Sequence, residues 1–91
     1  MVMLMNMMGE LKKFLEVSMD IKIKYCVVWN YEPRARSLRH ELSEEFGYWA
    51  ELVPGDRGAF EIYVNGSEVF SKLHLDRFPE EREIVRLINE L

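Results

Sequence analysis

Cysteine is nearly absent from this sequence of 91 residues, in which Cys26 is the only one. One cysteine cannot form an internal disulfide, which excludes the disulfide-stapled scaffolds of small secreted proteins and indicates a reducing compartment, the cytoplasm. Proline and glycine are also few, at three and five residues, whereas 48% of the residues are hydrophobic and 31% are charged. This composition excludes collagen-like and low-complexity chains and is typical of one globular domain.

The chain also lacks an excess of positive charge and a long apolar run. It has 12 basic and 16 acidic residues, for a net charge of −4. Its overall field therefore repels phosphate backbones and anionic bilayers, so neither nucleic acid nor a membrane is an expected partner. The apolar start, MVMLMNMM, is too short to span a bilayer and has neither the basic start nor the cleavage pattern of a signal peptide.

Familiar catalytic and metal-binding patterns are missing as well. The sequence contains no Ser-His-Asp order and no glycine-rich phosphate loop, and residues 55–58 are interpreted as the turn before a strand. His40 and His74 have no cysteine or second histidine at ligand spacing, so no metal site is expected. Hydrolase and kinase functions therefore have no support.

The chain divides into a leader of residues 1–19 and one domain of residues 20–91. Five of the six methionines lie in the first eight residues, and Leu11, Phe14 and Leu15 have the spacing of a short helix. The leader is interpreted as either a short helix or a disordered segment. Met19 directly precedes the first strand pattern, which leaves translation from Met19 as an alternative.

Hydrophobic periodicity predicts the order strand, helix, strand, hairpin, helix. Strands are expected at residues 21–27 and 49–53, and helices from Pro33 to the residue before Gly47 and from Pro79 to the end, with a connection over residues 73–78. The predicted buried positions of the first strand and the two helices are Ile21, Ile23, Tyr25 and Val27, then Ala35, Leu38, Leu42 and Phe46, then Ile84, Leu87, Ile88 and Leu91.

The clearest local signal is Asn65-Gly66, the preferred pair for a two-residue type I′ turn, which predicts a hairpin over residues 60–71. In that register Ile62 faces Val69, and the side chains on the core face are Phe60, Ile62, Val64 and Val69. A strand–helix–strand segment requires a crossover, so the first two strands are expected to be parallel and the hairpin antiparallel. The fold class is therefore α/β, in the form of an α+β sandwich: a four-stranded mixed sheet with both helices packed on it.

Short segments along the domain carry a resemblance to a known family. They are YC at 25–26, YEPRA at 31–35, LVPG at 52–55, GAFEI at 58–62, NG at 65–66, FSK at 70–72 and RFPE at 77–80. In this order and spacing, residues 20–91 resemble the selenoprotein W-like, or Rdx, family. The resemblance implies a thioredoxin-like β-α-β-β-β-α fold and a role in thiol redox chemistry and cell redox homeostasis.

The family motif is Cys-x-x-Cys or Cys-x-x-selenocysteine after the first strand, and its first position in this chain is Cys26. The second position is Trp29, which cannot resolve a mixed disulfide, so no dithiol reductase activity is expected. What remains is at most a monothiol oxidoreductase, whose catalytic Cys26 forms mixed disulfides with glutathione or with a protein thiol or disulfide. Apart from glutathione as a co-substrate, no cofactor is expected, and the protein is expected to be a monomer, with a Cys26-linked dimer as the alternative.

Four more residues are candidates for substrate binding. Arg34, Arg36 and Arg39 lie in the first half of the first helix, against the preference of the helix dipole, which suggests that they stabilise a Cys26 thiolate or receive an anionic group. The candidates are Trp29, Tyr31, Arg34 and Arg36. The alternative is structural: the arginines form a solvated face with nearby glutamates, the two rings pack, and Cys26 is a small buried hydrophobe.

A second function belongs to a different class. A degenerate family member would keep the fold as a protein-binding module, with residues 28–32 and the hairpin of residues 60–71 as its surface. Exposure separates the two functions, because a reactive thiol is at least partly accessible, whereas a Cys26 buried under the Trp29 ring favours the binding module.

Overall fold

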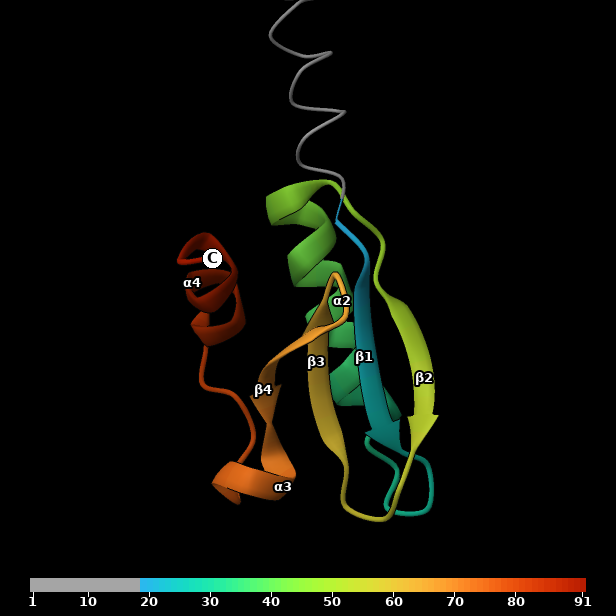
Figure 1. Cartoon of the computed structure of the whole chain (residues 1–91). Coiled ribbons are helices and arrows are strands. Elements are labelled where there is room, and N and C mark those ends of the chain that lie inside the picture. The colour runs from blue at the N-terminus through green and yellow to red at the C-terminus, as the bar shows by residue number, and fades with distance from the viewer. Residues whose placement is uncertain (1–18) are drawn as a thin grey trace, which may run out of the picture.

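The computed structural model describes residues 19–91, and the prediction for residues 1–18 lies outside this range. The described chain forms one four-stranded sheet in the order β2-β1-β3-β4, with helices before and after the last three strands (Figure 1). The elements are β1 (Ile21–Cys26), α2 (Glu32–Phe46), β2 (Glu51–Gly55), β3 (Phe60–Val64), β4 (Ser67–Ser71), α3 (Lys72–Leu75) and α4 (Glu83–Asn89). Met19, the last residue of the expected leader, packs partly buried against the core.

The sheet is mixed, as the sequence predicts. β1 pairs with β2 in parallel, with α2 as the crossover, and β3 pairs antiparallel with both β1 and β4. Helix α2 packs on β1 and β2, and α4 packs beside β4 (Figure 1). The predicted α+β architecture of a thioredoxin-like domain is therefore confirmed.

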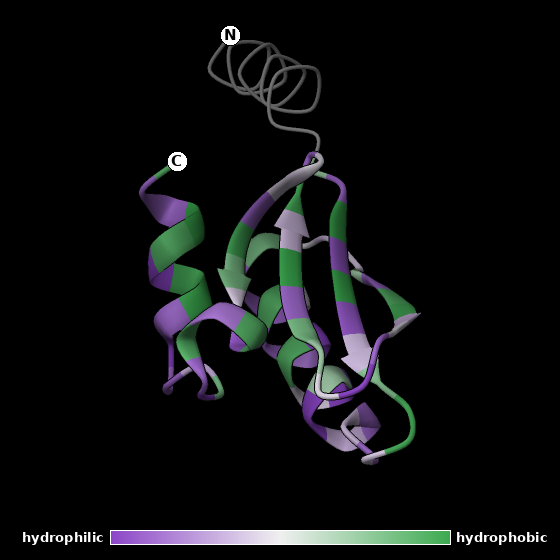
Figure 2. Ribbon diagram, turned by 60° about the horizontal axis from the view of Figure 1, so that its bottom comes forward, coloured by the Kyte–Doolittle hydropathy of each residue, from purple (hydrophilic) through white to green (hydrophobic). Residues whose placement is uncertain are grey.

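One face of the sheet forms the core. Hydrophobic and polar residues alternate along the strands (Figure 2), so every second side chain points at the helices. Buried side chains of α2 and α4 join those of β1, β3 and β4, and Ala50 just before β2, in one cluster: Ile21, Ile23, Ala35, Leu42, Ala50, Phe60, Ile62, Val64, Phe70, Ile84, Val85 and Ile88.

The hairpin turn is where the sequence places it, but the register beyond it differs. Asn65 and Gly66 have φ of 52° and 84°, as a type I′ turn requires, and Val64 faces Ser67. An irregularity between Ile62 and Tyr63 then pairs Ile62 with Phe70 instead of Val69. The extra residue in β4 turns Phe70 into the core and leaves Val69 half-buried, so the assignment of Val69 to the core was wrong.

The first strand is one residue shorter than predicted. Hydrogen bonds from the N–H of Asn30 to the carbonyl of Val27 and from the N–H of Tyr31 to the carbonyl of Cys26, both 3.0 Å, turn the chain after Cys26. Val27 is therefore 55% exposed, which corrects its assignment to the buried face. Tyr25 is only half-buried.

Two further boundaries move for reasons that the pattern does not reveal. Strand β2 begins at Glu51 instead of Trp49 and continues through Pro54, beyond the predicted end at residue 53. The peptide bond of Pro54 is trans, and its missing N–H is tolerated because β2 is an edge strand. Helix α4 begins at Glu83 instead of Pro79, because Arg82 adopts a left-handed conformation with φ of 65°. Leu91 lies beyond that helix and is 74% exposed, so its predicted burial was also wrong.

The connection after the hairpin contains the short helix α3, which covers part of the other face of the sheet. Ser71 caps α3 by accepting a hydrogen bond from the N–H of His74 at 3.2 Å. Glu61, buried beneath this cover, accepts hydrogen bonds from Ser71 Oγ at 2.8 Å and from the N–H of Leu73 at 3.3 Å. These contacts hold α3 close to the end of β1, where Cys26 lies.

Candidate functional site

The candidate site lies at the end of the sheet where the two parallel strands finish. Cys26 is the last residue of β1, and the loop after β2 reaches the same edge (Figure 1). The N–H of Cys26 donates to the carbonyl of Ala59 at 2.8 Å, which fixes this second loop beside the cysteine. Crevices at the carboxyl ends of parallel strands are the usual ligand sites of such sheets.

The Cys26 side chain is free of any disulfide and fully buried. The N–H of Trp29, the residue at the second motif position, donates to Cys26 Sγ at 3.3 Å. Burial raises the pKa of the Cys26 thiol, but hydrogen bonds from the backbone of Gly58, Trp29 and Val28 and the charge of Arg57 lower it, and the net result is a lowered pKa. The backbone thus forms a small anion nest around the sulfur.

Gly58 makes the cover of this nest possible. It has a φ of +81°, and a Cβ atom placed on it would lie 3.0 Å from Trp29 Cζ3 and 3.7 Å from Leu73 Cδ2. The Trp29 ring therefore packs close to Gly58, a position whose backbone conformation favours glycine, with Leu73 of α3 nearby. Trp29 remains 51% exposed, so its ring belongs to the surface near the thiol and not to the core.

A row of aromatic rings leads from this cover into the core. The ring centroids of Trp29 and Tyr31 are 6.1 Å apart, those of Tyr31 and Phe78 are 4.7 Å apart, and those of Phe78 and Phe60 are 5.3 Å apart, all edge-to-face. Lys72 lies over Tyr31 and Phe78, with its Nζ 5.4 and 5.2 Å from their centroids. This row holds the loop after β1 in place through contacts that favour such ring geometry.

The arginines of α2 separate into three environments. The Arg34 guanidinium lies 4.0 Å from the centroid of Phe78, whereas Arg36 pairs with Glu32 at 3.2 Å on an exposed face, as the structural alternative states. Arg39 stacks on Trp49 at 4.2 Å. The charge that acts on the thiol is that of Arg57, so the expectation that the α2 arginines stabilise a Cys26 thiolate receives no support from this geometry.

Of the predicted site residues, the structure therefore brings four together at one end of the sheet and leaves Arg36 outside. Arg57 and Gly58 were missed because segment 55–58 looks like an ordinary turn. The predicted topology could have identified them, because two parallel strands that end at the same edge of a sheet place the loops that follow them side by side.

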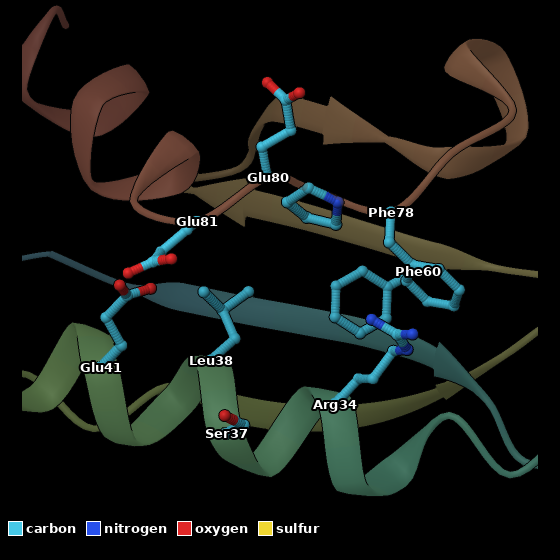
Figure 3. Close-up of a pocket in the computed structure, with 9 residues that line it drawn as sticks. Arg34, Ser37, Leu38, Glu41, Phe60, Phe78, Glu80 and Glu81 are labelled. Carbon is cyan, nitrogen blue, oxygen red and sulfur yellow. The ribbon is translucent and has the colours of Figure 1, made fainter.

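A groove lies next to the aromatic row, on the helix side of the sheet (Figure 3). Its volume is about 250 Å³, and it runs between α2 and the segment before α4. Arg34 lies beside Phe78 and Phe60 at one end, and Glu41 and Glu81 point toward each other at the other end (Figure 3).

The described residues contain no group of three or more histidine, cysteine or acidic side chains arranged to hold a metal ion. Among residues 19–91, no helix is long and apolar enough to cross a bilayer.

Comparison with known proteins gives a consistent result. The model of the Rdx family matches residues 20–90. Proteins named migration and invasion enhancer 1 from Mus musculus and Bos taurus are 38% and 36% identical over 69 residues; these matches cover 75% of this chain and only 60% of either relative. A selenoprotein W-related protein from Vibrio cholerae has a similar crystal structure, with a TM-score of 0.75 and 28% identity over 80% of this chain and 95% of its own. A protein from Bordetella parapertussis has the same TM-score and 29% identity over 79% and 95%.

Proposed function

Because the chain belongs to the Rdx family, whose model matches residues 20–90, we propose that it is a redox protein that works with the single thiol of Cys26. The observation that carries the proposal is the convergence of backbone N–H groups on Cys26 Sγ, with the N–H of Trp29 at 3.3 Å. A thiolate is the nucleophile in disulfide exchange, and such donors favour the thiolate over the thiol.

The reaction has two exchanges. The Cys26 thiolate attacks one sulfur of oxidised glutathione or of a partner disulfide, the sulfur–sulfur bond breaks, and the departing thiolate takes a proton from water. Cys26 is then in a mixed disulfide. Trp29 offers no second thiol, so a glutathione thiolate attacks the partner's sulfur in this mixed disulfide, breaks its bond to Cys26 and releases Cys26 as a thiolate; the product is a disulfide between the partner and glutathione. When the first disulfide is oxidised glutathione itself, the same attack regenerates oxidised glutathione, so only a partner disulfide gives net turnover. A cytoplasmic location supplies the glutathione.

Access to the sulfur requires movement of its cover. Cys26 is fully buried, while Trp29 and Val28, whose backbone groups lie against its sulfur, are 51% and 71% exposed. Because about half of Trp29 is already exposed, turning its ring away costs less than displacing a fully buried ring. Binding of a disulfide substrate therefore displaces the Trp29 ring from Gly58 before the exchange begins.

The proposal is tested by the pH dependence of iodoacetamide alkylation of the folded protein, followed by intact mass. We expect alkylation with a midpoint below the free-thiol value of about 8.5 and a glutathione adduct after treatment with oxidised glutathione. Cys26→Ser is the control that removes both products. Alkylation only after unfolding in urea would refute the proposal.

A second candidate is a protein-binding module, which the burial of Cys26 and the exposure of its neighbours favour. Val28, Trp29 and Leu73 are each more than half exposed at the same end of the sheet, and exposed apolar residues that cluster mark interaction surfaces. In this case Cys26→Ser leaves partner binding unchanged and Trp29→Ala weakens it. Under the redox proposal, Cys26→Ser abolishes the covalent adduct, including any Cys26-linked dimer.

A further inference from the structure

The groove between α2 and the segment before α4 is built from parts that the thiol chemistry does not use. Leu38 and Ser37 come from α2, and the rings of Phe60 and Phe78 close one end (Figure 3). Pro79, in the segment before α4, also lines the groove. The wall opposite α2 is held by Arg77, whose guanidinium donates to both carboxylate oxygens of Glu83 at 2.7 and 2.9 Å. The groove is thus a fixed feature with an apolar middle.

Its two ends carry opposite charge. At one end the Arg34 guanidinium lies over Phe78, and no carboxylate of the described residues pairs with it. At the other end the carboxylates of Glu41 and Glu81 face each other across the groove (Figure 3). Arg82 already lies among these carboxylates: it pairs with Glu41 at 3.7 Å and with Glu45, and the charge of Glu81 also raises the pKa of Arg82. Three carboxylates against one guanidinium leave this end of the groove acidic, and a second cation reduces the repulsion that remains.

The size of the groove limits what it can hold. Pockets that enclose a drug-sized ligand or a cofactor usually measure about 300–1,000 Å³, and this groove measures about 250 Å³. It therefore suits a few side chains of an extended segment. The net charge of −4 attracts a basic partner over longer distances.

We propose that this groove binds an extended peptide segment of a partner protein, in which an acidic residue, one or two apolar residues and a basic residue follow one another. The basic side chain lies between Glu41 and Glu81, the apolar side chains cover Leu38 and Pro79, and the acidic side chain pairs with Arg34. This interaction goes beyond the redox proposal and does not depend on it, since Cys26 is not part of the groove.

The test uses fluorescein-labelled peptides and fluorescence anisotropy. One peptide has an aspartate, two leucines and two lysines in that order, a second has the reversed order, and a third has the same residues scrambled. We expect one ordered peptide to bind at least fivefold more tightly than the scrambled one and to bind more weakly as salt is raised. Equal affinities for all three, or no binding at millimolar concentration, would overturn the proposal.

Variants of neighbouring glutamates provide a matched comparison. Glu81→Gln should weaken binding about threefold to fivefold, as expected for one exposed charge pair. Glu80→Gln removes the same charge one residue away; Glu80 also lines the groove, but its carboxylate points away from Glu41 and Glu81 (Figure 3), so this variant should bind as the parent does. Ser37→Arg, which fills the groove from α2, should abolish binding. If both glutamine variants weakened the affinity for the peptide equally, the attraction would be a general effect of charge. If Ser37→Arg bound the peptide as tightly as the parent, the peptide would lie elsewhere. Either result would overturn the proposal.

Discussion

The ion pair between Arg77 and Glu83 leads to a quantitative prediction about stability. The Glu83 side chain is 9% exposed and receives hydrogen bonds from Arg77 and from the N–H of Glu80 at 2.8 Å. The hydrogen bonds from Arg77 lower the pKa of Glu83 most, burial opposes them, and the N–H of Glu80 and the charges of Arg77 and Arg86 lower it further, to about 2 from an ordinary value of 4.5. The folded protein therefore binds this proton less tightly than the unfolded chain does.

The magnitude follows from that difference. A carboxyl group whose pKa falls this far on folding stabilises the folded state by about 3 kcal/mol at neutral pH. The Arg77 side chain is 43% exposed, so solvent screens the pair, and the expected contribution is about 1–3 kcal/mol. Because the folded pKa is the lower one, this stabilisation is complete above pH 4.5 and disappears as the pH falls toward 2.

The assay is urea denaturation of the parent protein and of Glu83→Gln at several pH values. At pH 7, Glu83→Gln should lower the urea midpoint by about 0.7–3 M, taking a slope of roughly 1–1.5 kcal/mol per M for a domain of this size. The two curves should converge as the pH approaches 2, since all other carboxyl groups titrate in both proteins. Arg77→Gln should lower the free energy of unfolding by a similar amount. The double variant should lose much less free energy of unfolding than the two single variants lose together. A difference that stays constant from pH 7 to pH 2 would refute this reasoning.

Three further predictions concern residues of the candidate site. Arg57→Gln should raise the pH midpoint of Cys26 alkylation, whereas Arg36→Gln, which removes an arginine from the exposed face of α2, should leave it unchanged; equal effects would rule out a specific role for Arg57. Gly58→Ala should lower the free energy of unfolding by about 1–2 kcal/mol, because the φ of +81° strains alanine and its Cβ meets the Trp29 ring, and unaltered thermal unfolding would contradict this. Trp29→Cys should introduce turnover in an insulin-reduction assay where the parent has none, and a silent variant would show that the remaining site does not support dithiol chemistry.

The sequence predicts most of the architecture because most of it depends on local signals. The alternation in β1, the stripe of α2 and the Asn65-Gly66 turn each specify an element without reference to distant residues. The start of α4 could not be found this way. The left-handed conformation of Arg82 separates Pro79 from the helix, and Arg82 forms ion pairs with Glu41 and Glu45 of α2, so the boundary depends on a tertiary contact.

The site divides along the same line. Cys26, Trp29 and Tyr31 are close in sequence, and the strand-to-helix pattern together with the family resemblance identifies them. The backbone hydrogen bond from Gly58 and the charge of Arg57, which both act on Cys26, come from the loop after β2. Their effect depends on the direction of the backbone in that loop, which the types of side chain do not reveal. The shift that exchanges Val69 for Phe70 in the core is of the same kind, since a bulge changes which side of the strand faces inward.

The placement of Pro54 in β2 has a consequence for how molecules of this protein meet one another. β2 and β4 are the two outer strands of an open sheet, and outer strands offer unpaired backbone groups to which other chains can add. Strand β2 is only five residues long, contains Pro54 and begins with the exposed Glu51. In β4, the displaced residue Val69 interrupts the regular spacing of the backbone groups. Both borders of the sheet thus carry features that discourage edge-to-edge pairing between folded molecules.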